Sequence, residues 1–356
     1  MEITVLDTNF SKIEIVDALD SFIWTDRYYR RGDFEIANKP SIKLIESLKE
    51  DYYLTIPDSI HTMIIESIEL KTNIETGDKM LVSGRSLESI LDRRILTKQT
   101  TLSGGFQSAI RSLLLDNVID PEDPDRKITN FIFKESSDPG VEALSVDEQF
   151  FGDNLYDVIE ALCTYNEIGF QVILTEDNEF EFSLYNGKDR SFDQVDNPFV
   201  SFSPSLDNLS NTTYYYSKIP RKTATIVGGE GEGADQTILS VMLPGGGGTG
   251  LSRREMYTDA SDLASSIDGE ILSEEDYLTL LTNRGIRELT DNQAVSAFDG
   301  KLDPTTTYVY GVDFFIGDIV QMKNEYNLTG KTRVTEVVFS ENIAGRSVYP
   351  TFDSTK

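Results

Sequence analysis

Few residues in this sequence could do acid–base, nucleophilic or metal chemistry. The chain of 356 residues has one histidine, His61, and one cysteine, Cys163. A Ser-His-Asp hydrolase or a histidine-ligated metal site would have to use that single imidazole. His61 enters a predicted strand after Pro57-Asp58, with no nucleophile motif near it, so we predict a structural histidine. Cys163 falls on the apolar face of a predicted helix, so we predict that it lies in the core.

One segment, Gly330-Lys331-Thr332, ends like a phosphate-binding P-loop. That motif needs another glycine five residues earlier, where Glu325 stands, and a strand–loop–helix context. This segment instead turns between two predicted strands. The glycine-rich stretch at residues 245–250 lacks the Lys-Ser/Thr pair that follows a phosphate cradle. We therefore predict no nucleotide site and no cofactor.

Carboxylates are too numerous to single out a catalytic pair. The 61 Asp and Glu residues give a formal net charge of -29 at pH 7, so some pairs reach glycosidase spacing by chance. Asp120, Glu122, Asp123 and Asp125 lack the spacing and the central glycine of an EF-hand, which predicts a solvated loop and no metal site. The charge argues against a protein that grips phosphate backbones. It fits a protein past which DNA slides, and it fits plain solubility equally well.

The composition is that of an ordinary globular chain, with 39% hydrophobic and 10% aromatic residues. Its length allows two to four domains, each with its own core. No apolar run approaches the roughly 18 to 20 residues of a membrane span, so we expect no membrane insertion. The first residues lack a basic and apolar secretory signal, and one cysteine excludes internal disulfides. Synthesis in a reducing cytoplasm fits these features.

Residue periodicity predicts a β-rich α+β fold. Short strands with turn residues between them fill the first hundred residues and the last fifty, which is typical of small barrels or sandwiches. A strand is expected at residues 62–71, and apolar residues at helical spacing fill much of the middle, as in Phe106, Ile110, Leu113 and Leu114. We expect a β-barrel domain at 1–100 with helical excursions at 30–50 and 86–96, and a mixed α+β domain at 101–210. A second β-barrel domain would follow at 211–356, with an inserted helix at 273–290.

Three helix starts carry recognisable capping residues. Ser86 can cap a short helix, and Asp153 can cap a longer one in the middle of the chain. Ser273 with Asp276 forms a capping box. These residues mark where the predicted helices begin.

Glycine clusters and tyrosines punctuate the second half of the chain. The glycine-rich stretches at 228–233 and 244–250 are expected to be flexible, exposed loops. Tyr214-Tyr215-Tyr216 is interpreted as strand packing rather than a base-stacking platform. A meander of short strands is expected from Tyr308 to Phe352, turning at 327–330 and 342–345.

The two strand-rich ends show a weak internal similarity. Residues 62–69, TMIIESIE, can be laid over residues 332–339, TRVTEVVF. Each segment follows an aromatic strand and a turn, and each precedes a turn and a last strand. This match favours two copies of one barrel, although two unrelated strand segments can agree as well.

Residues 81–94, LVSGRSLESILDRR, resemble a signature of the tail-hub (baseplate-hub) proteins of long-tailed phages. Such proteins also form the N-terminal part of tail-associated lysins. Residues 23–29 and 32–35 are similar to the opening of that family, and residues 310–314, 317–320 and 334–337 to its C-terminal end. The residues that we single out as its structural motif are Trp24, Gly84, Arg85, Ser86, Leu87, Arg93, Arg94, Gly317 and Asp318.

This resemblance implies a homotrimer in which two similar β-barrels per subunit alternate around a ring. It implies docking on the hexameric distal tail protein ring, contact with the tape-measure protein, and a platform for tip or receptor-binding proteins. DNA would pass through the ring without specific binding, and we hypothesise an acidic lumen.

The expected role is a non-enzymatic virion protein at the distal end of the tail. The chain stops after its last predicted strand, so no lysin domain is expected behind it. Two alternatives stay open: a tail-associated cell-wall or polysaccharide hydrolase, and a carbohydrate-recognising receptor-binding module.

Overall fold

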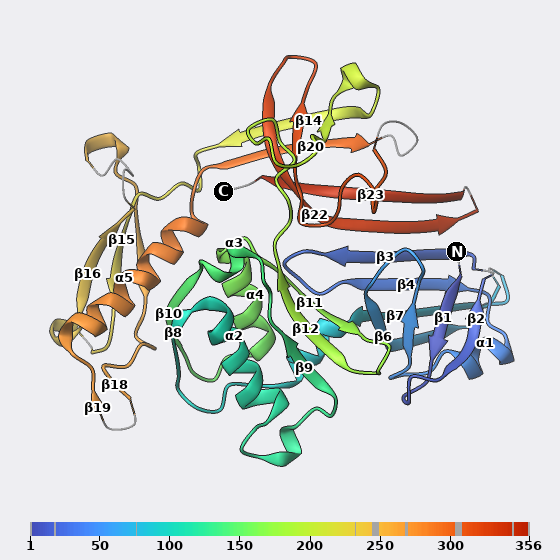
Figure 1. Cartoon of the computed structure of the whole chain (residues 1–356), viewed down its shortest axis with the longest axis horizontal. Coiled ribbons are helices and arrows are strands. Elements are labelled where there is room, and N and C mark those ends of the chain that lie inside the picture. The colour runs from blue at the N-terminus through green and yellow to red at the C-terminus, as the bar shows by residue number, and fades with distance from the viewer. Residues whose placement is uncertain are drawn as a thin grey trace.

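The computed structural model describes residues 2–17, 19–75, 77–231, 233–243, 249–267, 270–302, 308–343 and 345–354. Both ends of the chain contribute to one eleven-stranded sheet (Figure 1). Its strands are β1 (Ile3–Leu6), β2 (Lys12–Val16), β3 (Ser21–Arg27), β4 (Asp33–Asn38), β5 (Tyr53–Thr55), β6 (Thr62–Lys71), β7 (Lys79–Ser86), β13 (Ser201–Phe202), β21 (Ile319–Lys323), β22 (Thr329–Asn342) and β23 (Gly345–Ser354). They lie in the order β13-β21-β22-β3-β4-β7-β6-β5-β1-β2, and β23 pairs with β22.

The two ends of the chain meet where β22 pairs antiparallel with β3. Phe339 lies opposite Trp24 in that pairing, and both side chains are buried. Alternate residues of each strand face one side of a sheet, so both strands supply one core. Phe22 and Val337 belong to the same buried cluster. N- and C-terminal strands therefore share a hydrophobic core.

The predicted β-rich α+β class is confirmed, but the strands do not close into a barrel. In the described part of the chain the sheet is open, because β2 pairs only with β1 and β13 only with β21. The strand β22 uses its edge to reach β3 in the other half of the chain. None of the described helices is long and apolar enough to span a membrane.

The middle of the chain packs helices against small sheets. It contains β8 (Thr100–Gly105), α2 (Phe106–Leu114), β9 (Phe131–Lys134), α3 (Pro139–Glu142), β10 (Ser145–Phe150), α4 (Leu155–Tyr165), β11 (Gly169–Leu174) and β12 (Phe180–Tyr185). The predicted apolar stripe of α2, with Phe106 and Ile110, is buried. Cys163 of α4 is fully buried, as predicted, and burial raises the pKa of its thiol.

A smaller unit is inserted between β14 (Leu209–Ser217) and β20 (Val295–Leu302), which pair antiparallel. It consists of β15 (Ala224–Gly228), β16 (Ile238–Met242), β17 (Glu255–Asp259), β18 (Ser266–Ile267), β19 (Glu270–Ile271) and α5 (Glu274–Asp291). In Figure 1, α5 lies along the β15–β16 strands. Gly285 allows that close approach, since a Cβ there would lie 2.8 Å from Val227 Cγ2.

Helix starts agree with the sequence in part. Ser273 accepts a hydrogen bond from the backbone N–H of Asp276, so the predicted N-cap of α5 is confirmed, while the Asp276 carboxylate accepts from the Ser273 hydroxyl. The predicted Asp153 cap is wrong by one residue, because Asn154 accepts from the Tyr156 N–H instead. The Asp153 carboxylate accepts from the N–H of Phe151 and so stabilises the preceding turn.

Two predicted helical excursions are mostly not α-helical. Residues 30–50 contain the strand β4 and only a short α1 (Ile42–Ser47), and residues 86–96 contain the 3₁₀ turn η1 (Leu87–Arg93). Ser86 precedes η1 but does not cap it. Its Oγ instead accepts a hydrogen bond of 2.7 Å from the N–H of Gly32.

The first glycine cluster is not an exposed loop throughout. Gly228 and Gly229 are buried, and a Cβ on Gly228 would lie 2.0 Å from the hydroxyl of Tyr257. Tight packing, rather than flexibility, therefore explains these two glycines. Most of the second cluster, residues 244–248, lies outside the described residues.

Candidate functional site

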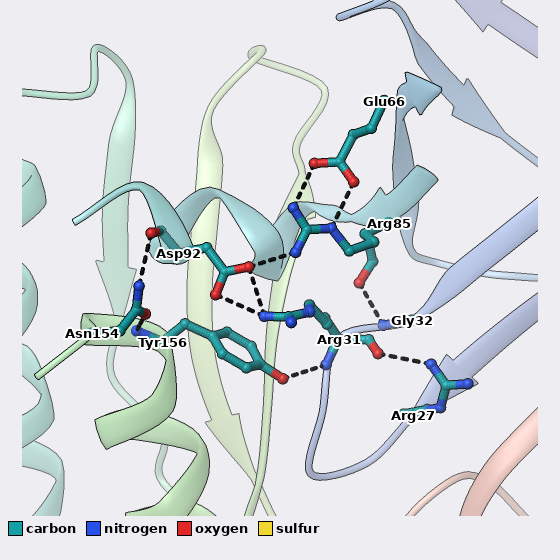
Figure 2. Close-up of polar contacts among 9 residues, drawn as sticks. Arg27, Arg31, Gly32, Glu66, Arg85, Asp92, Asn154 and Tyr156 are labelled. Carbon is teal, nitrogen blue, oxygen red and sulfur yellow. Dashed lines mark hydrogen bonds and ion pairs between the residues drawn. The ribbon is translucent and has the colours of Figure 1, made fainter. Parts of the chain in front are cut away.

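A polar cluster joins the N-terminal strands to the middle helices, and we call it the arginine junction (Figure 2). At its centre Arg85 of β7 donates to both carboxylate oxygens of Glu66, at 2.6 and 2.7 Å, and to Asp92 at 2.5 Å. Two carboxylates thus hold one guanidinium in a fixed plane. The motif arginine therefore has a structural partner on each side.

A second arginine extends the junction to α4. Arg31 donates to both oxygens of Asp92 at 2.7 Å, and its guanidinium lies 4.2 Å from the ring centre of Tyr156. The Tyr156 hydroxyl accepts the Arg31 backbone N–H, and Asn154 donates to the Asp92 carbonyl. The carboxylate of Asp92 therefore serves two arginines of the N-terminal strands, and the start of α4 joins the cluster through Tyr156 and Asn154.

The glycine and serine of the motif position Arg85. A Cβ on Gly84 would lie 1.8 Å from the carbonyl oxygen of Ile64, so only glycine fits between β6 and β4 there. Ser86 is fully buried and bonds to Gly32 through both its hydroxyl and its backbone N–H. The motif thus fixes the end of β7, from which the Arg85 side chain reaches its partners.

Replacing Arg85 by leucine is expected to lower the free energy of unfolding by about 1–2 kcal/mol. Charge-assisted hydrogen bonds contribute about 1.5–3 kcal/mol, and partial exposure of this pair reduces that value. A double-mutant cycle with Glu66→Gln, followed by urea denaturation, should give a coupling energy of about 1 kcal/mol. Arg93→Leu is the matched control, because Arg93 is half exposed and its nearest carboxylate oxygen, on Asp51, lies 4.0 Å away. Equal losses for both arginines would contradict a special role for Arg85.

A second polar cluster is buried around the only histidine, and we call it the histidine cluster. His61 Nδ1 lies 3.4 Å from Glu88 Oε1, an ion-pair contact longer than a good hydrogen bond. The Trp24 indole and the Ser59 hydroxyl donate to the two oxygens of Asp26. Glu88 also accepts the backbone N–H of Val172 at 2.8 Å, which ties η1 to β11.

Charges in this cluster stabilise one another. Burial disfavours a charged imidazole, but the carboxylates of Asp26 and Glu88 outweigh it and raise the pKa of His61 to about 9. Burial also opposes ionisation of Glu88, yet His61 holds the pKa of that carboxyl below its usual range. The pKa of Asp26 is raised, chiefly by burial. A protonated His61 beside an ionised Glu88 is therefore the favoured state at neutral pH.

These residues do not form a hydrolytic triad. The Ser59 hydroxyl donates its hydrogen bond to the carboxylate of Asp26 and not to the imidazole of His61. A triad needs the base next to the nucleophile and the acid behind the base. The predicted structural role of His61 is consistent with this geometry.

Stability should fall as the pH rises from about 6.5 to 9. The folded pKa of His61, about 9, lies above the value of about 6.5 in an unfolded chain. The stabilisation is therefore fully present below pH 6.5 and is lost as the pH rises through 9. We expect a loss of up to about 3 kcal/mol in wild type, measured by urea unfolding at pH 6 and 9.5. His61→Gln should flatten this dependence, because no other histidine is present. An unchanged slope in the variant would refute the assignment.

A third cluster joins the N-terminal, middle and C-terminal segments around Tyr28. Its ring lies in a slot between Gly169 and Gly317, where added Cβ atoms would come within 2.3 and 2.4 Å of the ring. Gly317 also has a φ of 89°, which favours glycine. The guanidinium of Arg333 lies 5.3 Å from the ring centre of Tyr28 and donates to Glu167.

The neighbouring motif residue, Asp318, is buried and ionically paired. It accepts hydrogen bonds from Arg190 Nε at 2.6 Å and from the backbone N–H groups of Lys188 and Phe315. Arg190 is itself buried, so the pair ties the segment after β12 to the start of β21. Asp318 thus fixes a segment crossing rather than a reaction centre.

The predicted motif residues therefore gather at three packing clusters, with some exceptions. Leu87 is buried in the middle core, and Arg94 donates to the carbonyl of Arg126. Arg93 lies at the surface. Sequence reasoning missed Asp92 and Glu88 as charge partners, although both lie in the quoted segment.

Two cavities border the histidine cluster and the meander. One, of about 510 Å³, is lined by His61, Tyr185 and Tyr310, and a neighbouring one of about 470 Å³ by Tyr310, Phe314 and Phe202. Within the described residues no three His, Cys, Asp or Glu side chains are grouped so that they could hold a metal ion. Asp120 and Glu122 of the acidic loop pair with Lys127 and Lys98.

Comparison with known proteins gives a family and a fold. The family model described as Siphovirus ReqiPepy6 Gp37-like protein matches residues 2–352. No curated protein matches the chain. The prophage MuSo2 43 kDa tail protein from Shewanella oneidensis has 13% identity and a TM-score of 0.60, covering 99% of this chain and 98% of that one.

Two further solved structures resemble the chain over nearly its whole length. The tail protein from Neisseria meningitidis MC58 has 11% identity and a TM-score of 0.58, covering 99% of this chain and 96% of its own. The prophage tail protein gp18 from Listeria monocytogenes EGD-e has 11% identity and a TM-score of 0.56, with coverages of 100% and 96%. At such identities the likeness establishes the fold that these chains share.

Proposed function

Because the chain belongs to the Siphovirus ReqiPepy6 Gp37-like protein family and shares its fold with prophage tail proteins, we propose that it is the hub at the distal end of a phage tail. It is a structural component of a tail, and its three polar clusters hold segments together rather than act on a substrate. The proposal adds its position in the tail and its assembly as a ring.

The observation that carries the proposal is a repeated strand order. In the N-terminal half the strands follow the order β3-β4-β7-β6-β5. In the C-terminal half β14 pairs with β20, β20 packs beside β23, and β23-β22-β21 follow. Each half is thus an outer pair of strands, then a long hairpin, then a short strand. This agreement supports two copies of one structural unit.

Local details of the two long hairpins agree as well. β6 has a bulge at Glu66 and β22 has one at Thr335, where the pairing register shifts. Ile74 and Ile343 are fully exposed at the two hairpin tips. Each of these isoleucines lies eight residues beyond the bulge of its own hairpin. Matching irregularities of this kind are stronger support than the weak similarity of the sequences.

A subunit with two similar units suits a trimer that docks on a hexameric partner. Three copies present six similar units, so a homotrimer can match the sixfold distal tail protein ring. We place the two units in the proposed domains 1–100 and 211–356, with the middle domain 101–210 outside them. The tape-measure protein and the tip or receptor-binding proteins are the proposed partners above and below this ring.

The solvent face of the shared sheet is suited to DNA passage. Paired residues across β23, β22, β3, β4, β7 and β6 form one row: Ser347, Ser340, Ile23, Glu35, Ser83 and Ser67. The row contains four serines, one isoleucine, one carboxylate and no cation, while Arg85, two residues from Ser83, is held by carboxylates. Proteins bind the phosphate backbone of DNA through lysine and arginine side chains. A lumen lined by this row would therefore let DNA pass without adsorbing.

Imaging tests the hub proposal directly. Negative-stain images of the purified protein are expected to contain rings with a central hole. Tails labelled with an antibody against the chain should carry the label at the distal tip. Label along the tube or at the head end would contradict the proposal.

We propose a non-enzymatic role. Incubation of the protein with cell walls in a zymogram is expected to leave the walls intact. Clearing that disappears on carboxylate substitution would instead favour the hydrolase alternative.

A further inference from the structure

The pairing of β22 with β3 is a template for a contact between copies of this chain. Residues 336–342 of β22 pair with residues 21–27 of β3, which joins the C-terminal unit to the N-terminal one. In the N-terminal unit β3 is the outer strand, and β4 is its only neighbour within that unit. The C-terminal unit therefore uses the edge of its long hairpin to bind the outer strand of the next unit.

The corresponding edge of the N-terminal unit is open. In the described part of the chain β6 pairs with β5 only over residues 62–64, and beyond Glu66 only with β7. Leu70 lies four residues beyond the β6 bulge at Glu66, and Phe339 lies four residues beyond the β22 bulge at Thr335. Phe339, where β22 pairs with β3, is 1% exposed, whereas Leu70 is 52% exposed. The same position is thus covered in one unit and bare in the other.

The outer strand of the C-terminal unit is open too. β14 pairs with β20 on one side and with no other strand among the described residues. Tyr214, Tyr215 and Tyr216 are 40%, 51% and 52% exposed, so both faces of the strand are partly bare. In Figure 1 β14 lies at the outer edge of the C-terminal strands, on the side away from β3. Bare strand edges pair readily with other chains.

We propose that β14 of one copy pairs antiparallel with residues 66–71 of β6 in the next copy. This inference rests on the proposed ring and names the contact that builds it. The contact repeats the β22–β3 junction between molecules, so the units follow one another head to tail. A head-to-tail contact of this kind closes a ring when its rotation permits. The exposed tyrosines then gain the cover that β22 gives to Trp24.

The template also predicts the register. Thr25 and Asp33 are the last pair of β3 and β4, and Ser217 and Val295 are the last pair of β14 and β20. Thr25 and Ser217 are therefore equivalent, and so are the residues that precede them, Trp24 in β3 and Tyr216 in β14. Since Trp24 lies opposite Phe339, Tyr216 is expected opposite Leu70.

Disulfide cross-linking tests this pairing on the full chain. Leu70→Cys combined with Tyr216→Cys should give intermolecular disulfides under mild oxidation, because Cα atoms about 4–7 Å apart can be bridged. Leu70→Cys with Tyr215→Cys is the matched control, since neighbouring strand residues point to opposite faces. We expect on the order of tenfold more cross-linked product from the first pair, because of this geometry. Leu251→Cys, at a fully exposed and therefore more accessible site in the inserted unit, serves as a distant control with Leu70→Cys.

Leu70→Asp provides a second measurement that needs no cysteine. The side chain is exposed in the isolated chain, so the melting temperature should stay unchanged. The dissociation constant of the oligomer, from light scattering, should rise on the order of tenfold because an apolar contact is lost.

The outcomes separate this pairing from the hub proposal. Cross-linking of Leu70→Cys with Tyr216→Cys above both controls supports the pairing. Rings in the images without that cross-link overturn the pairing and leave the hub role standing. A chain that stays monomeric at high concentration and does not cross-link also overturns the pairing, and tip labelling of tails then decides the hub role independently.

Discussion

Gly84→Ala is expected to destabilise the protein by about 4 kcal/mol or more, enough to abolish folding in a marginally stable chain. The added Cβ would lie 1.8 Å from the carbonyl oxygen and 2.9 Å from the carbonyl carbon of Ile64, and 2.9 Å from Phe34 Cε1. Two of these atoms are backbone of a paired strand, so they cannot move aside without breaking the sheet. The measurement is urea denaturation, or soluble yield if no folded protein is obtained.

Gly105→Ala is the control for that substitution. Its nearest atom would be Ser108 Oγ at 3.8 Å, which is an ordinary contact. Gly105 precedes α2 at its N-cap, where replacing glycine by alanine costs less than about 1 kcal/mol. A similar, small effect at both glycines would mean that β6 and β7 can separate, and the close approach would not explain the motif.

The family motif is best understood as a packing device. Gly84 lets two strands approach, Ser86 bonds to Gly32, and Arg85 reaches two carboxylates. The contacts of this segment are thus those of a junction between strands and helices.

Local elements could be predicted from the sequence because their signals are local. β6 has the bounds that its β-branched run predicted, and α2 buries the apolar stripe that predicted it. The prediction that Gly330-Lys331-Thr332 turns between two strands is wrong, because these residues lie within β22 and the turn precedes them at residues 324–328. A strand is still not the loop-to-helix context that a P-loop needs. The prediction that Ser86 caps a helix was wrong, because a buried serine before a 3₁₀ turn has the same sequence pattern as a helix-capping serine.

Contacts between distant segments could not be predicted. The pairing of β22 with β3 depends on which strand edges remain open after each half has folded, and no residue spacing encodes that choice. The slot around Tyr28 needs Gly169 and Gly317, which are far apart in the sequence. Each glycine alone is typical of a turn. Only the fold brings both of them against one aromatic ring.

Asp318→Ala is the second substitution with a large expected effect. It would leave Arg190, which is 6% exposed, as a buried guanidinium without its carboxylate. Removing one partner of a buried ion pair destabilises a protein by about 3–5 kcal/mol. Replacing both partners, in Asp318→Ala with Arg190→Leu, should recover part of that loss in urea denaturation, because no unpaired charge then remains buried. Asp193→Ala is the exposed control, since its partner Lys331 is partly exposed and such pairs contribute less than about 1 kcal/mol. If the double variant is no more stable than Asp318→Ala alone, the pair does not hold the start of β21, and the backbone bonds of Asp318 to Lys188 and Phe315 must do so instead.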